Sequence, residues 1–182
     1  MPVTVLVAHF FSPLVAPLVA PLVAPLVASL CLVPPVNSPV VEPFVAPACS
    51  YCAGHRTVDF ANTGVANAAV VAPIAGRVTF AGEVAGRRFV SVRSGDHTVT
   101  VGGVGTLMVT AGQTVAAGET VGWGTGLGPV TLSVRRDAGQ PAEEYLDPGQ
   151  FLARRIGRAR LVPTDGTRPR PVRTRLVCPT GR

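Results

Sequence analysis

Lysine is absent from this sequence of 182 residues, and all sixteen basic residues are arginine. Charged residues make up only 14% of the chain and aromatic residues only 5%. Histidine occurs three times, at His9, His55 and His97, which limits any chemistry that needs several imidazole groups. Twenty glycines and eighteen prolines work against long helices and favour short strands joined by turns. The length suffices for one domain with a modest core.

The net charge of +6 comes from the C-terminal end of the chain. Residues 1–150 contain seven arginines and nine acidic residues, a net charge of −2, whereas residues 151–182 contain nine arginines and one acidic residue, a net charge of +8. A basic segment can bind an anionic partner, and it can equally be a solvated, disordered tail. If it binds, we expect an anionic polymer or a membrane surface as its partner, and not nucleic acid.

The stretch from Phe10 to Val41 contains no charged residue and is long enough to cross a membrane. Its centre repeats Pro-Leu-Val-Ala four times. A proline at every fourth position removes a helical hydrogen bond each time, so a regular transmembrane helix is not expected. A secretory signal is the preferred interpretation; a low-complexity linker or an upstream start codon would give the same pattern. We therefore predict export to the cell envelope or the extracellular space.

Composition divides the chain into three regions. Residues 1–53 form an apolar, proline-rich leader and linker, residues 54–152 form a domain, and residues 153–182 form a basic tail rich in arginine and proline. Within the domain, several segments are rich in β-branched residues and are bounded by glycine or proline. These predicted strands are residues 69–72, 77–81, 88–93, 97–101 and 130–136.

A six-residue repeat, Val-x-x-Gly-x-x, runs through the middle of the domain. Its valines are Val109, Val115 and Val121, and glycines occupy positions 112, 118 and 124. Valine supplies an inward side chain, and glycine permits a turn where other residues would clash. The repeat predicts compact hairpins whose arms bury matching valines.

The order of the motifs resembles that of a known family. The hexad also occurs in lipoyl and biotinyl carriers, but these need a lysine at a hairpin tip, so the lack of lysine excludes them. The chain is instead similar to the lysostaphin/LytM-type peptidoglycan endopeptidases over about residues 54–152. The matching segments are Gly54–Phe60, with its His-x-x-x-Asp spacing, Val71–Gly82, Val109–Gly122 and Asp147-Pro148. The resemblance implies an all-β fold, an antiparallel β-sandwich or barrel-sandwich hybrid with hexad hairpins and irregular N- and C-terminal extensions.

The resemblance also implies a zinc site, which this sequence retains only in part. A catalytic zinc takes three protein ligands and activates a water molecule. In the family these ligands are the His and Asp of the first motif and the second His of a His-x-His strand. His55 and Asp59 are present, but the corresponding strand, residues 128–136, contains no histidine. We therefore predict no catalytic residue, and no zinc unless the site is rearranged.

The cysteines offer an alternative metal site. Cys49, Cys52, His55 and Asp59 place four potential ligands within eleven residues. In an oxidising compartment Cys49 can instead bond to Cys52, or one of these two to Cys178. Cys31 is assigned to the leader.

Three other residues are candidates for ligand binding. Trp123 follows the last hexad valine, where it can offer its ring to a sugar or cover the end of the core. Arg135 and Arg136 end a strand close to the incomplete zinc site. They can meet the carboxylates of peptide stems, or simply occupy a solvated edge.

These observations favour a noncatalytic module of the cell envelope that binds peptidoglycan or a cell-wall hydrolase. One alternative is an active zinc endopeptidase with a rearranged site, using His55, Asp59 and one of the nearby cysteines. Another is a protein that acts through its basic tail on an anionic polymer or a membrane. A third donor atom beside His55 and Asp59, with an open position facing a groove, would argue against a purely noncatalytic domain.

Overall fold

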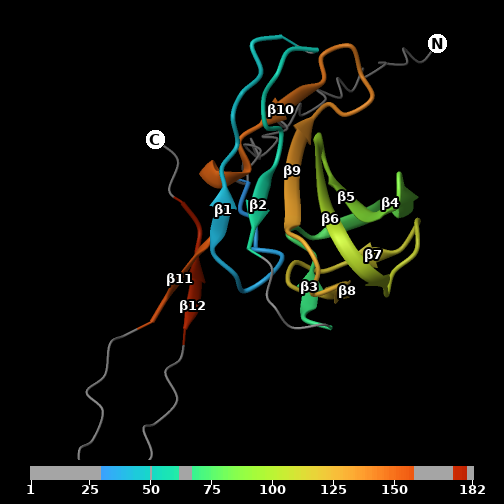
Figure 1. Cartoon of the computed structure of the whole chain (residues 1–182), viewed down its shortest axis with the longest axis vertical. Helices are drawn as coiled ribbons and strands as arrows, with labels where there is room; N and C mark the ends of the chain where they lie inside the picture. Colours follow the sequence, from blue (N-terminus) through green and yellow to red (C-terminus); the bar gives the residue numbers. More distant parts are fainter. Residues whose placement is uncertain (1–29, 50, 62–66, 158–173, 180–182) are drawn as a thin grey trace, which may run out of the picture.

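The computed structural model describes residues 30–49, 51–61, 67–157 and 174–179. The Pro-Leu-Val-Ala repeats, His9 and much of the basic tail therefore lie outside the described residues. The described part consists of β-strands and one short 3-10 helix (Figure 1). It contains no helix with the length and apolar character needed to span a membrane.

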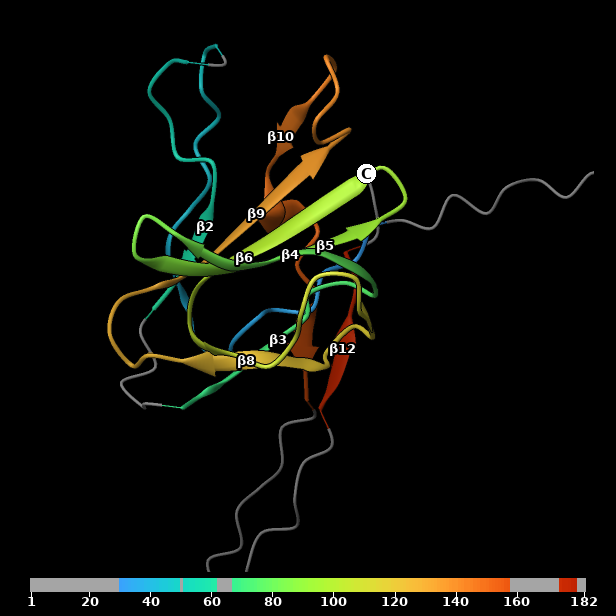
Figure 2. The ribbon, with the colours of Figure 1, turned by 90° about the vertical axis from the view of Figure 1, so that its right-hand side faces the viewer.

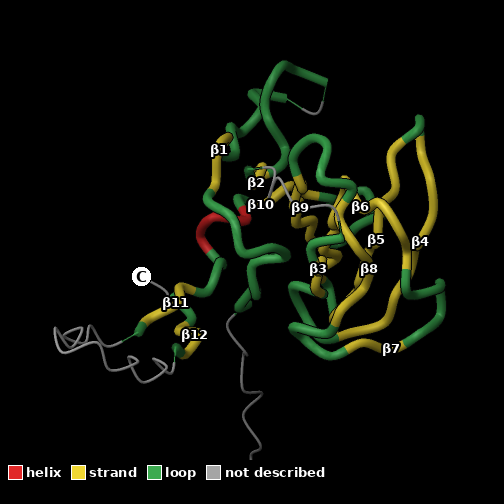
Figure 3. The backbone as a smooth tube through the Cα atoms, turned by 60° about the horizontal axis from the view of Figure 1, so that its bottom comes forward, coloured by secondary structure: helices red, strands yellow, loops and turns green. Residues whose placement is uncertain are grey.

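Twelve strands are present in this part of the chain. They are β1 (Val40–Glu42), β2 (Val58–Phe60), β3 (Ala69–Val71), β4 (Gly76–Val84), β5 (Arg87–Ser94), β6 (His97–Leu107), β7 (Thr114–Val115), β8 (Thr120–Gly124), β9 (Val130–Arg136), β10 (Glu144–Leu146), β11 (Arg154–Ile156) and β12 (Arg175–Val177), with helix η1 (Pro148–Gln150) after β10. The first ten belong to one antiparallel sheet with the path β1-β2-β9-β6-β5-β4-β7, to which β10, β3 and β8 attach. Strands β11 and β12 form a separate ribbon (Figure 3). The predicted all-β fold is confirmed.

Strand β6 belongs to both layers of the fold. Its first half, His97–Gly102, pairs with β9, and its second half, Val104–Leu107, pairs with β8. A register shift between Val104 and Thr106 marks the change of partner, and irregularities of this kind bend a strand. The sheet therefore turns back on itself, and Figure 2 shows β3 and β8 as a layer beneath β4, β5 and β6.

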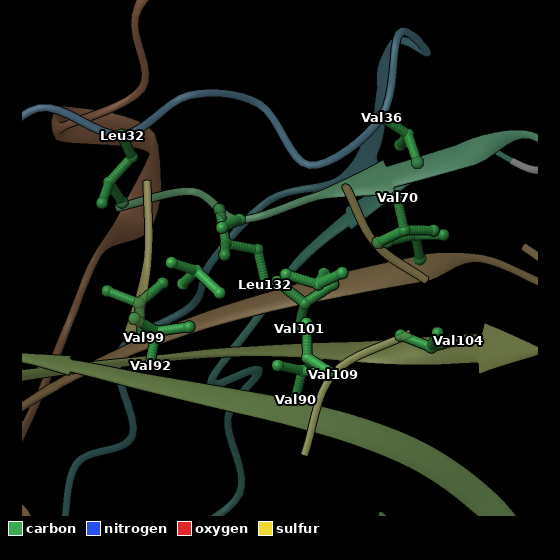
Figure 4. Packing of buried hydrophobic residues seen from close by; sticks show 14 of the residues in the cluster. Leu32, Val36, Val70, Val90, Val92, Val99, Val101, Val104, Val109 and Leu132 are labelled. Atoms are coloured by element: carbon green, nitrogen blue, oxygen red, sulfur yellow. The ribbon is translucent and has the colours of Figure 1, made fainter. Parts of the chain in front are cut away.

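Valine fills the space between the two layers. On β5, β6 and β9 the side chains alternate, so that Val92, Val99 and Val134 lie in one row across the sheet. All three are buried, as are Val70 of β3 and Val121 of β8 in the opposite layer. Branched aliphatic side chains pack well on a pleated surface. The resulting cluster is the core of the domain (Figure 4).

The hexad behaves as predicted in its turns but not in its pairing. Its three valines are buried, and Gly112 and Gly118 have φ angles of +97° and +83°, which favour glycine. However, β7 and β8 do not pair with each other: β7 pairs with β4, and β8 with β3 and β6. The repeat therefore sets the spacing of two short strands, and their partners come from other parts of the chain.

The longer predicted strands are present. Residues 130–136 form β9 as expected. Strand β4 continues to Val84 and β5 begins at Arg87, so both extend into the segment between the predicted strands 77–81 and 88–93. The turn itself is Ala85-Gly86, both with positive φ. Such a two-residue turn matches the twist of a hairpin and lets pairing continue to its end.

The core also includes chain that precedes residue 54. Leu32 is 0% exposed and pairs with Leu152 in a parallel bridge, and its N–H donates to the carbonyl of Phe151. Val36 packs in the same cluster. Cys31, which was assigned to the leader, is instead bonded to Cys178, and this bond fastens the residues after β12 to the start of the described chain. That assignment was wrong because spacing alone does not show which cysteines approach one another.

Loss of the Cys31–Cys178 bond should destabilise the domain strongly. The bond joins residues 147 positions apart, whereas Cys49 and Cys52 are only three apart. In the chain-entropy model, a longer closed loop restricts the unfolded chain more. We expect the double variant Cys31→Ser/Cys178→Ser to lose about 2–5 kcal/mol of unfolding free energy, measured by guanidinium denaturation without reductant. The matched pair Cys49→Ser/Cys52→Ser should lose less; the reverse order would contradict this account.

Candidate functional site

The face of the sheet opposite the core is polar. Because strand neighbours share a face, Ser91 of β5, Thr100 of β6 and Ser133 of β9 form one row across three strands. The hydroxyls of Ser91 and Thr100 lie 2.8 Å apart and are hydrogen-bonded. This row is made of the residues that alternate with the core valines.

A groove of about 600 Å³ lies over this hydroxyl row. Its lining combines the three hydroxyl residues and Thr79 with apolar and aromatic side chains and one arginine: Phe80, Val84, Phe89, Tyr145 and Arg135. Phe80, Val84 and Tyr145 are exposed. Polar groups between aromatic walls suit a ligand that carries both amide and apolar parts.

The His-x-x-x-Asp motif lies at one edge of the same face. Asp59 pairs with Thr131 across β2 and β9, so its side chain shares the face of Thr131 and Ser133. His55 precedes β2 and is held by two backbone hydrogen bonds with Val45, each 2.9 Å long. His55 Nε2 lies 3.6 Å from Asp59 Oδ1. The structure therefore brings these two predicted ligands together.

A third donor, not predicted from the sequence, completes this group. Glu42 is paired with Asp59 in the β1–β2 register, and its Oε1 lies 3.9 Å from His55 Nε2. One ligand atom from each of the three residues lies within 4.8 Å of the others. Among the described residues, Glu42, His55 and Asp59 are therefore the group that could hold a metal ion.

Hydrogen bonds fix the orientation of these donors. His55 Nδ1 donates to the carbonyl of Pro43 at 2.9 Å, so Nε2 is the ring atom directed at the carboxylates. Thr57 donates its hydroxyl proton to Asp59 Oδ1 at 2.6 Å, and its oxygen lies 3.0 Å from His55 Nε2. Asp59 is only 9% exposed. This buried carboxylate thus has the partner that its burial requires.

The strand expected to carry His-x-His presents small side chains here. The β9 residues on the face of Asp59 are Thr131 and Ser133, separated by the buried Leu132. Next to Thr131 on β6 is Gly102, where an added Cβ would lie 2.5 Å from both Thr131 Oγ1 and the Phe89 ring. On the β9 and β6 side of Asp59, hydroxyls and a bare backbone therefore occupy this face.

The two predicted ligand-binding arginines are ion-paired. Arg135 Nη1 lies 3.2 Å from Glu143 Oε1, and Arg136 bonds to Glu144. The Gly139 N–H and then Arg135 lower the pKa of the Glu143 carboxyl, and Glu144 raises the pKa of Arg136. Arg135 lines the groove, whereas Arg136 is not among its lining residues. A ligand carboxylate at Arg135 would therefore have to compete with Glu143.

The other predicted residues lie apart from this group. Trp123 is half-buried on β8, next to Ala69 and Thr106, and does not line the groove. Cys49 and Cys52 are bonded to each other at the tip of the loop between β1 and β2, so neither offers a thiolate to a metal. The disulfide excludes the cysteine-containing ligand set in this state of the protein.

Glu42 was missed because its role depends on strand pairing. It lies seventeen residues before Asp59 and belongs to no motif with it. The available signal was weak: Glu42 is the first acidic residue of the sequence and ends its long uncharged stretch. Only the β1–β2 register places it opposite Asp59.

Comparisons with known proteins bear on the fold. No family model matches the sequence, and no curated protein does. Csd3 from Helicobacter pylori is 19% identical and superposes with a TM-score of 0.57 over 69% of this chain and 35% of that chain. A chain of the SpoIIQ–SpoIIIAH pore-forming complex is 16% identical, with a TM-score of 0.56 over 69% of this chain and 92% of that chain. A second structure, of SpoIIIAH and SpoIIQ, gives 18% identity and a TM-score of 0.54 over 66% and 99%.

This chain spans about a third of the length of Csd3, and identities this low establish a shared fold only. LytM-type peptidases are among the similar structures. The order of the sequence motifs and the three-dimensional likeness agree, and the described part of this chain has the LytM-type fold.

Proposed function

We propose that this chain is a noncatalytic LytM-type domain of the cell envelope that binds the peptide part of peptidoglycan in the groove over β4, β5, β6, β9 and β10. The observation that carries the proposal is the polar face. This face has a groove with aromatic walls. On β9, the strand that corresponds to the family's His-x-His strand, Thr131 and Ser133 present hydroxyl groups.

The side chains that β9 places next to Asp59 do not supply the chemistry of hydrolysis. Cutting a peptide bond requires an activated water and a group that takes up its proton. Thr131 and Ser133 are hydroxyl residues, and such groups act as nucleophiles or proton acceptors only beside a base. Among the described residues the remaining histidine, His97, lies at the start of β6 with Nδ1 2.7 Å from Asp96. The groove is therefore suited to holding a peptide without cutting it.

The groove offers a peptide several complementary contacts. The hydroxyls of Ser91, Thr100 and Ser133 can exchange hydrogen bonds with peptide amides. Phe89 and Tyr145 supply apolar contact, and the guanidinium of Arg56, next to His55, lies 5.6 Å from the centre of the Tyr145 ring. That contact connects the loop between β1 and β2 to the groove.

Export is part of the proposal. Two disulfides, Cys31–Cys178 and Cys49–Cys52, leave none of the four cysteines free. Such bonds persist in oxidising compartments outside the cytosol. The likeness to SpoIIQ–SpoIIIAH structures is compatible with a protein partner in the envelope, such as a cell-wall hydrolase.

The ribbon of β11 and β12 supports a second contact, to an anionic polymer. All three residues of β11 are exposed, and Arg154 and Arg155 line a shallow cleft with Asn37 and Ser38. In the part of the chain that the structure describes, no ion pair involves these two arginines or Arg175, in contrast to Arg135 and Arg136. The Cys31–Cys178 bond fixes the base of this basic ribbon.

An active zinc endopeptidase with a rearranged site is the second candidate. Glu42 favours it, because a catalytic zinc needs three protein ligands and Glu42 is the third donor beside His55 and Asp59. This candidate differs from the first in one respect that can be measured, namely turnover.

Filling the groove should abolish peptidoglycan binding. We expect Thr100→Arg to weaken cosedimentation with purified sacculi by at least about tenfold, because a long cation on the groove floor excludes the peptide. Thr106→Arg is the matched control, since Thr106 is an exposed threonine on the same strand and lies outside the groove. Equal binding by both folded variants would place the binding surface elsewhere.

Cleavage assays should show no turnover. We expect the full chain, supplied with Zn²⁺, to leave cross-linked peptidoglycan intact, because Thr131 and Ser133 cannot take the proton from a water molecule at neutral pH. The measurement is the release of soluble fragments over time. Sustained release that His55→Ala abolishes would overturn the noncatalytic proposal and establish the endopeptidase.

Removing two arginines from the ribbon should weaken polyanion binding. We expect Arg154→Gln/Arg155→Gln to bind polyphosphate less tightly than the unmodified chain, and we expect binding by the latter to fall steeply with added salt. Fluorescence anisotropy at several salt concentrations measures both effects. The control is Arg87→Gln/Arg88→Gln, on the hairpin of β4 and β5. If that variant loses as much affinity, the contact depends on overall charge and not on the ribbon.

A further inference from the structure

We infer that the basic ribbon of β11 and β12 docks on the surface of an anionic lipid membrane. Its arginines meet the phosphate groups of the lipids, and the aliphatic side chains between them enter the apolar boundary beneath. The inference rests on the ribbon proposed above as a contact for an anionic polymer, and it goes further by naming a lipid surface as the partner.

Arginine and aliphatic residues face each other throughout the ribbon. Every pair in its register joins one residue of each kind. The pairs are Arg154–Val177, Arg155–Leu176 and Ile156–Arg175. Because successive residues of a strand point to opposite faces, both faces of the ribbon have guanidinium groups as well as aliphatic side chains. The ribbon therefore has neither a purely apolar face nor a purely polar one.

The aliphatic side chains of the ribbon are exposed to water. Ile156 is 49% exposed and Leu176 is 42% exposed. Their sheet consists of these two strands, and a two-stranded ribbon by itself is at best marginally stable in water. Figures 1 and 3 show the ribbon on the side of β1, apart from the layers that enclose the valine core. An apolar boundary would cover side chains that the domain leaves in solvent.

The arginines of the ribbon are available to an anion. Among the described residues, Arg154, Arg155 and Arg175 are exposed and take part in no ion pair, whereas the ion-paired arginines lie on β5 and β9. The sequence from Arg154 to Val177 contains eight arginines and one acidic residue, a net charge of +7. Charge of this sign and density is attracted to the negative surface of a membrane.

An apolar wall beside the arginines favours lipid over a soluble polyanion. The two arginines of β11 line a cleft of about 390 Å³. Val40 and Phe60 are among its other lining residues, and Val40 is 46% exposed. Polyphosphate offers phosphate groups alone and gains nothing from apolar side chains. A lipid offers phosphate next to acyl carbons, so basic and apolar side chains can both contribute to binding.

Membrane docking and the groove use different parts of the chain. The groove is lined by residues of β4, β5, β6, β9 and β10, and none of them lines the cleft beside the ribbon. The two contacts can therefore be tested one at a time.

Vesicle cosedimentation of the full chain tests the inference. The vesicles contain equal amounts of phosphatidylglycerol and phosphatidylcholine, and vesicles of phosphatidylcholine alone are the neutral comparison. We expect binding to the anionic vesicles only. Ile156→Ser/Leu176→Ser should weaken this binding at least about tenfold and leave polyphosphate binding unchanged, because only the vesicle has an apolar phase. Arg154→Gln/Arg155→Gln should weaken binding to both.

The matched control is Met108→Ser/Leu127→Ser. These two apolar residues follow β6 and β8 and are 57% and 85% exposed. The control variant should bind vesicles as the unmodified chain does. If it loses as much affinity as Ile156→Ser/Leu176→Ser, binding depends on overall surface hydrophobicity, and the inference is overturned.

Leu176→Trp reports on insertion without requiring any loss of binding. Compared with the unmodified chain, which contains Trp123, this variant should show an emission shift to shorter wavelength with anionic vesicles and none with polyphosphate. Vesicle-bound protein without the shift would overturn the inference, as would normal vesicle binding by Ile156→Ser/Leu176→Ser. Binding to polyphosphate without binding to vesicles would also overturn it and would leave the polymer contact standing. A chain that binds neither would overturn both.

Discussion

Alternation along β5, β6 and β9 is the constraint on which the structure depends. Each strand directs valine or leucine to one side and mainly serine, threonine, glycine or arginine to the other, with Phe89 at one end, and the register aligns these residues into rows. One side becomes an apolar core. In the described residues, every buried side-chain nitrogen or oxygen atom has a hydrogen-bond partner. The other becomes a floor of hydroxyls. A shift of one residue in this pairing would move every side chain to the opposite face. The burial of the apolar side chains therefore also determines which residues line the groove.

The same rows explain why the two carboxylates Glu42 and Asp59 and the groove are neighbours. Phe89, Gly102, Thr131, Asp59 and Glu42 follow one another across five strands. The groove occupies the middle strands, and the carboxylates occupy the edge. Thr131 lies between Asp59 and Gly102 in this row, and Ser133 of the same strand lines the groove.

The edges of the fold are held by bonds between distant parts of the chain. Leu32 and the Cys31–Cys178 bond attach the segment before β1 and the residues after β12 to one side of the core. The Cys49–Cys52 bond closes the loop that presents His55. These attachments lie beside β1, β11 and β12, which have three residues each. Short edge strands bury little surface, and covalent links compensate for this.

The sequence by itself determined the all-β fold, the main strands, the glycine turns of the hexad and the pairing of His55 with Asp59. Each of these follows from local spacing: alternate valines, a glycine every sixth residue, and a histidine four positions before an aspartate. The tertiary structure alone decided the role of Glu42, the Cys31–Cys178 bond and the partners of β7 and β8. These depend on which distant strands become neighbours, and that choice comes from burying the valine faces together. No local pattern encodes it, because residues seventeen or more positions apart meet only when the core closes.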